Sequence, residues 1–142
     1  MEITSHDYWE SYLSKITSFT LREKLSFYNN SIIDLLSRFD SRFPTSLDIG
    51  PGWIPIIAEL NNQISYIDSS YKVVQIKEKF GTLRYYIDFS LDKKNTIPFD
   101  IIHILISHAE VKSSSTCEQC GETAKLIVRP WYKTLCDTCA SS

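Results

Sequence analysis

Two pairs of cysteines near the end of the chain constrain its fold more than any other feature. Cys117 and Cys120 have two residues between them, as do Cys136 and Cys139, and 15 residues separate the two pairs. A C-x2-C step can form a tight turn in which both thiolates reach one tetrahedral ion, and Gly121 relieves the turn behind the first pair. The spacing therefore predicts a four-cysteine zinc ribbon. A pair of disulfides or a redox motif is the alternative.

The predicted zinc ion (Zn2+) is structural. Four thiolates fill the tetrahedron and leave no open position for water or substrate, whereas a catalytic zinc ion keeps one. Residues 125–129 and 131–135 have the pattern of two short strands that support the second cysteine pair. So short a segment lacks the core to fold without its metal. We therefore expect an α+β domain over residues 1–112 and a zinc-ribbon appendage over residues 113–142.

Charge is unevenly distributed along the chain. The 142 residues are 43 % hydrophobic, which suits one globular domain with a small appendage. The net charge of −2 excludes a uniformly basic nucleic-acid-binding protein. Residues 71–94, however, carry six Lys or Arg against three Asp or Glu. This distribution predicts a local basic patch on an acidic body.

Residues 75–89, QIKEKFGTLRYYIDF, have the pattern of a β-hairpin with Phe80-Gly81 as a two-residue turn. In that register Lys77 lies opposite Arg84, and directly opposed like charges are mildly destabilising. The pair therefore either extends into solvent or holds an anion between its side chains. The register assigns Gln75, Lys77, Lys79, Thr82, Arg84 and Tyr86 to the charged side, and Val74, Ile76, Leu83, Tyr85, Ile87 and Phe89 to the apolar side, with Val74 opposite Ile87 and Ile76 opposite Tyr85.

Apolar residues at helical spacing predict four helices. The first begins at a cap formed by Ser5, and the second at Thr20, which has capping-box spacing to Glu23. The third follows the turn at residues 50–55, and the fourth begins near Ile97. With the hairpin before the last helix, this order predicts an α+β fold: helices packed on a small antiparallel hairpin or sheet, followed by the zinc ribbon.

The second predicted helix carries a heptad seam of apolar residues. Packing within the domain explains this seam, and a homodimer interface is the other explanation. Because isolated coiled coils usually need more repeats, we favour packing. The seam consists of Leu21, Leu25, Tyr28, Ile32, Leu35 and Phe39.

The turn before the third helix is a candidate anion site. Gly50 and Gly52 allow the backbone to approach a ligand closely, and a helix start offers N–H groups to an anion. Trp53, the next residue, could stack on a base. The simpler explanation is that the glycines only form the turn.

Candidate catalytic residues are few, and we expect no enzyme. His103 and Glu110 share one face of the fourth helix but lie about 10 Å apart by helix rise, too far for direct proton transfer. His108 falls at the edge of the apolar stripe, where a packing role is the better explanation. The chain contains no G-x-S-x-G, P-loop, G-x-G-x-x-G or H-E-x-x-H pattern.

Five short motifs together resemble a group of small bacterial and phage or prophage proteins. In order, they are GPGWIPIIAEL, QIKEKFGTLRYY, Ala109-Glu110, CEQCG and WYKTLC, and the resemblance covers about residues 48–140. It implies a small protein of a mobile genetic element and brings no known activity with it. Two residues depart from the pattern: Cys139, where the group often has His, and Pro51, where it commonly has an acid. Positions that match the pattern are Trp53, Lys77, Lys79, Phe80, Gly81, Arg84 and Glu110.

These observations lead to the hypothesis of a non-enzymatic binding protein. Its ligand would carry phosphate, as a nucleotide signal or as nucleic acid, and a phage protein of this kind could counter host defence. The alternative is a protein–protein adaptor or inhibitor of a host protein that uses the helical seam and Trp131-Tyr132 of the ribbon. The predicted ligand-binding residues are Trp53, Lys77, Lys79, Gly81, Arg84, Tyr86 and Glu110.

The chain shows no sequence signal for secretion or membrane insertion. Its first residues, MEITSHDYWE, lack the basic start and apolar run of a signal peptide. No stretch approaches the roughly 18 apolar residues of a transmembrane helix. We therefore expect a protein of the bacterial cytoplasm, including that of a phage-infected host, without membrane contact.

Overall fold

The computed structural model describes residues 3–90, 96–128 and 130–141. Its helices are α1 (Ser5–Ser14), α2 (Phe19–Ser26), α3 (Asn29–Ser37), the 3-10 turn η1 (Pro51–Trp53), α4 (Ile54–Ile67), α5 (Thr96–Ser113) and α6 (Asp137–Ala140). Its strands are β1 (Leu47–Asp48), β2 (Lys72–Lys79), β3 (Thr82–Asp88), β4 (Lys125–Ile127) and β5 (Lys133–Leu135). Helices, two small sheets and a C-terminal cysteine cluster confirm the predicted α+β class.

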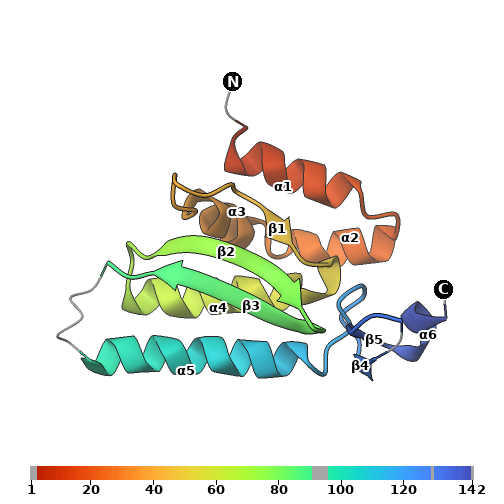
Figure 1. The fold of residues 1–142 in the computed structure, drawn as a ribbon. Coiled ribbons are helices and arrows are strands. Elements are labelled where there is room, and N and C mark those ends of the chain that lie inside the picture. The colour runs from red at the N-terminus through yellow and green to blue at the C-terminus, as the bar shows by residue number, and fades with distance from the viewer. Residues whose placement is uncertain (1–2, 91–95, 129, 142) are drawn as a thin grey trace.

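The larger sheet has the strand order β1-β2-β3, and α4 lies behind it in contact with α3 on one side and α5 on the other (Figure 1). Helices α1, α2 and α3 gather at the β1 side, α4 lies behind the hairpin, and α5 runs along the β3 side. The ribbon, formed by β4, β5 and α6, lies beyond the turn that joins β2 to β3. The hairpin turn therefore points at the ribbon.

One hydrophobic core holds the helices against the sheet. Burial of large apolar side chains is the main favourable term in folding, and here helices α1 to α5 and all three strands of the larger sheet contribute to it. The largest fully buried side chains are Trp9, Leu25, Ile32, Leu35, Trp53, Ile54, Ile57, Leu60, Ile64, Tyr71, Ile76 and Leu83.

The hairpin has the predicted register next to its turn. Lys77 pairs with Arg84 and Ile76 with Tyr85. Phe80 and Gly81 have φ angles of 55° and 84°, the combination that a two-residue type I′ turn requires. Further from the turn a β-bulge shifts the pairing between Val73 and Gln75.

The bulge corrects one predicted pair. Val73, not Val74, lies opposite Ile87, and Val73 is fully buried. An extra residue in one strand moves every later side chain of that strand to the other face, which alternation alone does not reveal.

The predicted second helix is two helices. Helix α2 begins at Phe19, after the cap Ser18, whose hydroxyl accepts the Leu21 amide at 3.2 Å. The chain then breaks at Phe27 and Tyr28 and restarts as α3. The expected start at Thr20 and the single continuous helix are therefore wrong.

The heptad seam of these two helices lies in the core, as we favoured. Leu25, Ile32 and Leu35 are fully buried, and Leu21, Tyr28 and Phe39 pack against the same core. The seam is not exposed as a dimer or adaptor interface, and that part of the alternative hypothesis is corrected.

Helix α5 is the predicted fourth helix and covers the outer edge of β3. Its Ser113 hydroxyl accepts the Leu83 amide at 2.9 Å, which satisfies a donor of the edge strand. Ile102 and Ala109 are buried against the core, as expected. Ile101, also expected in that stripe, is 43 % exposed. On the other edge, the short strand β1 pairs in parallel with β2, a contact that the sequence did not predict.

Candidate metal centre and hairpin face

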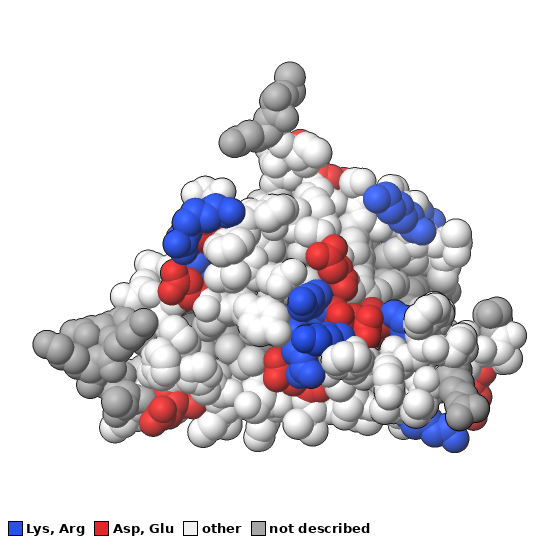
Figure 2. Space-filling model, viewed as in Figure 1, with Lys and Arg blue, Asp and Glu red and all other residues white. Residues whose placement is uncertain are grey.

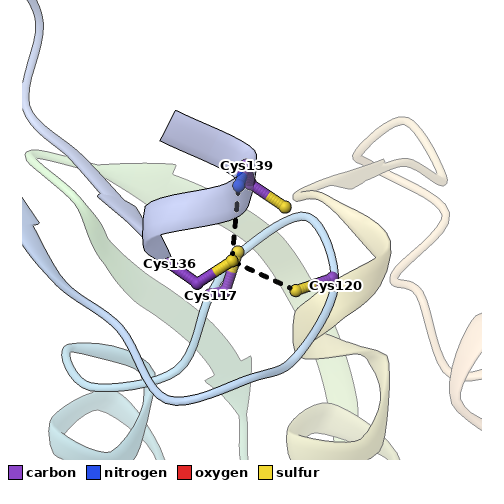
Figure 3. Close-up of side chains that lie close together, drawn as sticks. All are labelled: Cys117, Cys120, Cys136 and Cys139. Carbon is purple, nitrogen blue, oxygen red and sulfur yellow. Dashed lines mark hydrogen bonds between the residues drawn. The ribbon is translucent and has the colours of Figure 1, made fainter. Parts of the chain in front are cut away.

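The four cysteines converge on one point between the two halves of the ribbon (Figure 3). Their sulfur atoms all lie within 4.8 Å of one another, and the sulfurs of Cys120 and Cys136 are 3.6 Å apart. With metal–sulfur bonds of about 2.3 Å, thiolates around a tetrahedral ion lie about 3.8 Å apart. Cys117, Cys120, Cys136 and Cys139 can therefore hold one metal ion, as the spacing predicted.

Different parts of the chain supply the two cysteine pairs. Cys117 and Cys120 lie in the turn between α5 and β4, while Cys136 follows β5 and caps α6, with its sulfur accepting the Cys139 amide at 3.4 Å. Burial alone would raise the pKa of the Cys117 thiol, but the backbone N–H groups of Cys136, Cys120 and Gln119 outweigh it and lower that pKa to about 7. Burial raises the pKa of the Cys120 and Cys139 thiols, so of these three the surroundings favour only the Cys117 thiolate.

The first cysteine turn packs on the glycines of the GPG segment. The Gly52 amide donates to the Glu118 carbonyl at 2.7 Å, and the Gly50 amide donates to Oε2 of the Glu118 side chain at 3.0 Å. A Cβ atom on Gly52 would lie 2.0 Å from the Cys117 carbonyl oxygen. Close backbone approach is therefore what the glycines permit, as predicted, but it is the ribbon that approaches.

An anion does lie at the start of the third predicted helix, and it belongs to the protein. The Glu118 carboxylate accepts a hydrogen bond from the N–H group of Gly50, which was a candidate for binding an external anion. Trp53 is fully buried, and its indole N–H donates to the Thr116 carbonyl at 2.8 Å. The prediction that Trp53 stacks on a ligand is therefore wrong; the side chain fastens the segment before Cys117 to the core.

The hairpin turn also lies under the ribbon. Gly81 is buried, and a Cβ atom there would lie 2.5 Å from Cδ1 of Leu126. The Thr134 hydroxyl donates to the Gly81 carbonyl at 2.6 Å, and the Gly81 amide donates to Oε2 of Glu78 at 2.7 Å. Gly81 is thus enclosed by protein, which corrects its assignment as a ligand contact.

Lys133 of the ribbon joins two carboxylates that sequence reasoning did not connect. Its ammonium group lies 3.2 Å from Oε1 of Glu78 on β2 and 3.7 Å from Oε1 of Glu118 in the first cysteine turn. Burial lowers the pKa of Lys133, but the two carboxylates outweigh that effect and raise it. No sequence signal relates these three residues, because they lie far apart in the chain.

The hairpin face comprises Gln75, Lys77 and Lys79 of β2 with Thr82, Arg84 and Tyr86 of β3. Its ladder pairs Gln75 with Tyr86, Lys77 with Arg84 and Lys79 with Thr82, as predicted. Lys79 and Tyr86 are exposed, while Lys77 and Arg84 are half-buried.

Acidic residues border the cations of this face. Arg84 lies 4.0 Å from Glu110 of α5, and the ladder of β1 places Asp48 beside Lys77. Figure 2 shows Lys and Arg side chains gathered near the middle of this view, with Asp and Glu side chains among them. The structure brings Lys77, Arg84 and Glu110 together, and the face is mixed in charge rather than uniformly basic.

The two histidines of α5 differ in their surroundings. The His103 ring contacts the rings of Phe89 and Phe99, with centroids 5.5 and 4.6 Å away. His108 is exposed rather than packed at the edge of the core, which corrects the expected packing role.

Aromatic side chains cluster where the hairpin turn meets the ribbon. Phe80 and Tyr132 are in edge-to-face contact with centroids 5.6 Å apart, and the Lys79 ammonium lies 5.7 Å from the Phe80 ring. Trp131 is 74 % exposed. Phe80 and Tyr132 come from segments about fifty residues apart, so the sequence did not predict their contact.

Among the described residues, no helix is long and apolar enough to cross a membrane. No protein-family model, curated protein or solved structure matches the chain.

Proposed function

We propose that this chain is a zinc-stabilised, non-enzymatic binding protein whose hairpin face takes a phosphate-bearing ligand. The observation that carries the proposal is the pairing of Lys77 with Arg84 on the outer side of the hairpin. Two cations held opposite each other repel; Asp48 and Glu110 offset part of that cost, and an anion between the two cations would remove the rest. Arg84 can bind a phosphate through two parallel N–H groups.

Zinc is the metal that the site fits best. Four thiolates in a closed cluster are typical of structural Zn2+ sites, and a closed site leaves no position for substrate. Here the metal would hold together the two loops that pack on Gly50, Gly52 and Gly81. Its role would be to keep the ribbon against the hairpin turn rather than to perform chemistry.

The mixed charge of the face favours a nucleotide over a simple anion. Lys77 and Arg84 would bind phosphate, while the nearby Glu110 carboxylate could accept hydrogen bonds from ribose hydroxyls or base N–H groups. Tyr86, 42 % exposed, could stack on the base. The Arg84–Glu110 contact of 4.0 Å is loose enough for a phosphate to replace it.

The resemblance to phage and prophage proteins supplies a biological setting for this proposal. In an infected bacterial cell, a protein that binds a nucleotide signal without consuming it would withdraw that signal from host defence. Short single-stranded nucleic acid is the related candidate, because it offers the same phosphate and base chemistry.

A specific observation also supports the adaptor alternative. Trp131, Tyr132 and Phe80 present aromatic surface at one edge of the molecule, and large exposed aromatics are enriched in protein interfaces. An adaptor would use these residues, and its function would not depend on Lys77 or Arg84.

The decisive experiment uses the protein as it is purified from the cell. Absorbance at 260 and 280 nm, heat release and mass spectrometry would identify a bound nucleotide, alongside a count of zinc. We expect a nucleotide in the wild type that is lost in the Lys77→Ala/Arg84→Ala variant. A matched control, Lys15→Ala/Arg22→Ala, removes one lysine and one arginine from the N-terminal part of the chain. This variant should retain the bound nucleotide.

If nothing copurifies, fluorescence anisotropy with a labelled mononucleotide and a labelled single-stranded oligonucleotide replaces the release assay. Nucleic acid binding weakens steeply with salt because several phosphates are engaged, whereas binding of one or two phosphates depends on salt less. Equal binding by the wild type and the Lys77/Arg84 variant contradicts the proposal and favours the adaptor.

A further inference from the structure

Helix α5 carries a second apolar stripe that faces away from the core. We call this set the outer stripe: Ile97, Ile101, Ile104, His108 and Val111. Steps of four, three, four and three residues separate its members, the spacing of a heptad seam. The exposed fractions of its aliphatic members are 69 % for Ile97, 43 % for Ile101, 56 % for Ile104 and 70 % for Val111.

The packing of α5 on its own chain does not explain this stripe. The helix makes its contacts with the core through another side, where Ile102 and Ala109 are buried and Leu105 and Ile106 pack beside them. A helix on the surface of a globular protein normally has polar residues on its outer side. An aliphatic row along a helix at the outer side of the molecule therefore indicates a contact surface (Figure 1).

A groove lies directly beside the outer stripe. It has a volume of about 580 Å³ and is lined by Ile56, Glu59, Leu60 and Gln63 of α4 and by residues of α5 that include Leu105 and Lys112. His108 and Val111 also line it, so the stripe forms one wall of the groove. The surface thus has a ridge and a hollow side by side.

We propose that this surface binds a second copy of the same chain. A two-fold axis that runs parallel to α5 along the outer stripe brings this stripe against the same stripe of the other copy. Knobs-into-holes packing also needs a partner with the same residue spacing, and a second copy of α5 has it.

The charges around the outer stripe are compatible with this pairing. None of its five members is Lys, Arg, Asp or Glu. By helix geometry Asp100 lies on one flank of the stripe and Lys112 on the opposite flank. A two-fold axis along the helix places unlike flanks against each other, so that like charges do not meet.

The dimer would be weak. The stripe spans about 21 Å by helix rise, and a stable interface needs about 800 Å² from each partner, more than one short helix supplies. The groove wall on α4 widens the contact but adds polar side chains such as Gln63. We therefore expect a dissociation constant in the micromolar range, about −8 kcal/mol. This dimer does not depend on any ligand at the hairpin face.

Sedimentation equilibrium of the zinc-loaded chain over a range of concentrations tests the proposal. The wild type should rise from the mass of one chain towards that of two. Ile104→Asp should remain at the mass of one chain throughout, because an unpaired carboxylate would be buried in the seam. Ile3→Asp makes the same change at a residue 75 % exposed before α1, and should dimerise as the wild type does.

A second variant tests the same surface without introducing a charge. His108→Leu replaces the one polar member of the stripe and should tighten the dimer several-fold. Circular dichroism would confirm that each variant is folded, which the exposure of both side chains favours. A wild type that remains a single chain at every concentration, or an Ile104→Asp variant that dimerises equally well, overturns the proposal.

Discussion

Gly52 decides how closely the ribbon can approach the body of the protein. A Cβ atom there would lie 2.0 Å from the Cys117 carbonyl oxygen and 2.5 Å from the Gly121 nitrogen. Both are backbone atoms of the first cysteine turn, so neither can rotate away. The missing side chain of Gly52 therefore lets a hydrogen bond of 2.7 Å form between its amide and the Glu118 carbonyl.

Replacing Gly52 with alanine should destabilise the metal-loaded protein by about 3 kcal/mol or more, the upper end of the range for overpacking. Gly121→Ala is the matched control. Its φ angle of 86° strains any other residue, but the nearest atom to its Cβ would be the Gly52 carbonyl oxygen at 3.3 Å. We expect about 1–2 kcal/mol for that change. Urea unfolding measures both, and a larger loss for Gly121→Ala would contradict the clash.

Two buried tyrosines in the core, Tyr71 and Tyr85, belong to one hydrogen-bond network. The Tyr71 hydroxyl donates to the Asn61 side-chain oxygen and lies 2.7 Å from the Tyr85 hydroxyl. The Asn61 amide in turn donates to Oδ2 of Asp34 at 2.8 Å. Burial raises the pKa of Tyr71 and of Tyr85, so both hydroxyls stay neutral at physiological pH.

Tyr71→Phe should lower the free energy of unfolding by about 1–3 kcal/mol, because it leaves buried polar atoms of Asn61 and Tyr85 without their partner. Tyr66→Phe removes the same hydroxyl from a side chain that is 92 % exposed. That control should change stability by less than about 0.5 kcal/mol. Equal effects in chemical denaturation would show that the buried network adds nothing.

The glycines also show how far sequence reasoning reaches at single residues. Gly50 and Gly52 were expected to permit close approach and Gly81 to form the hairpin turn, and at each of the three another part of the chain lies where a Cβ atom would be. The approaching group was expected to be a ligand and is the ribbon. A glycine indicates that something comes near, but it does not indicate what, because the other side of the contact lies more than forty residues away.

Among the elements, the hairpin and the first helices differ in how well local sequence predicts them. The Phe80-Gly81 turn sets the register of the neighbouring pairs, and the structure has that register. The bulge between Val73 and Gln75 leaves no local signal. The break at Phe27 leaves none either, since the apolar spacing continues from Leu25 through Tyr28 as if one helix ran on.

Lys133 of strand β5 forms ion pairs with Glu78 of the hairpin and with Glu118 of the first cysteine turn. The side chains of Glu78 and Glu118 are only 19 % and 10 % exposed, so each carboxylate needs a partner. Lys133 is 42 % exposed, which moderates the strength of both ion pairs through solvent screening. The three residues hold β2, β5 and the first cysteine turn in one arrangement.

Lys133→Met keeps the apolar stem and removes the charge, and should cost about 1–2 kcal/mol of unfolding free energy. Lys125→Met, on the exposed side of the neighbouring strand β4, is the matched control and should cost less than about 0.5 kcal/mol. Adding Glu118→Gln to Lys133→Met should cost less than the sum of the single changes, because the two groups interact. Strict additivity would mean that the Lys133–Glu118 pair contributes nothing.

For the molecule as a whole, the central question is whether the ribbon is an appendage or part of the folded body. Residues 113–142 were expected to form an appendage to the α+β domain. The ribbon nevertheless covers Gly50, Gly52 and Gly81, and the Trp53 indole reaches across to the Thr116 carbonyl. If zinc holds the ribbon together, these contacts transmit the effect of the metal to the turn and to the hairpin.

Removal of the metal should therefore loosen the body as well as the ribbon. In hydrogen–deuterium exchange after chelation, we expect faster exchange at the Gly52 amide, which donates to the Glu118 carbonyl, and in the hairpin turn. Helix α3, which lies on the far side of the core, is the internal control and should stay protected. The melting temperature should fall, because metal-binding free energy is folding free energy in such a site.

Cys139→Ser provides the same test without a chelator. It removes the metal ligand that α6 supplies and leaves the first cysteine turn, which packs on Gly52, unchanged in sequence. Unchanged protection at Gly52 and the hairpin turn in both experiments would instead favour the separable appendage. The hairpin face, which begins next to that turn, would then keep its shape with or without the metal, and the ligand binding that we propose should not depend on the metal.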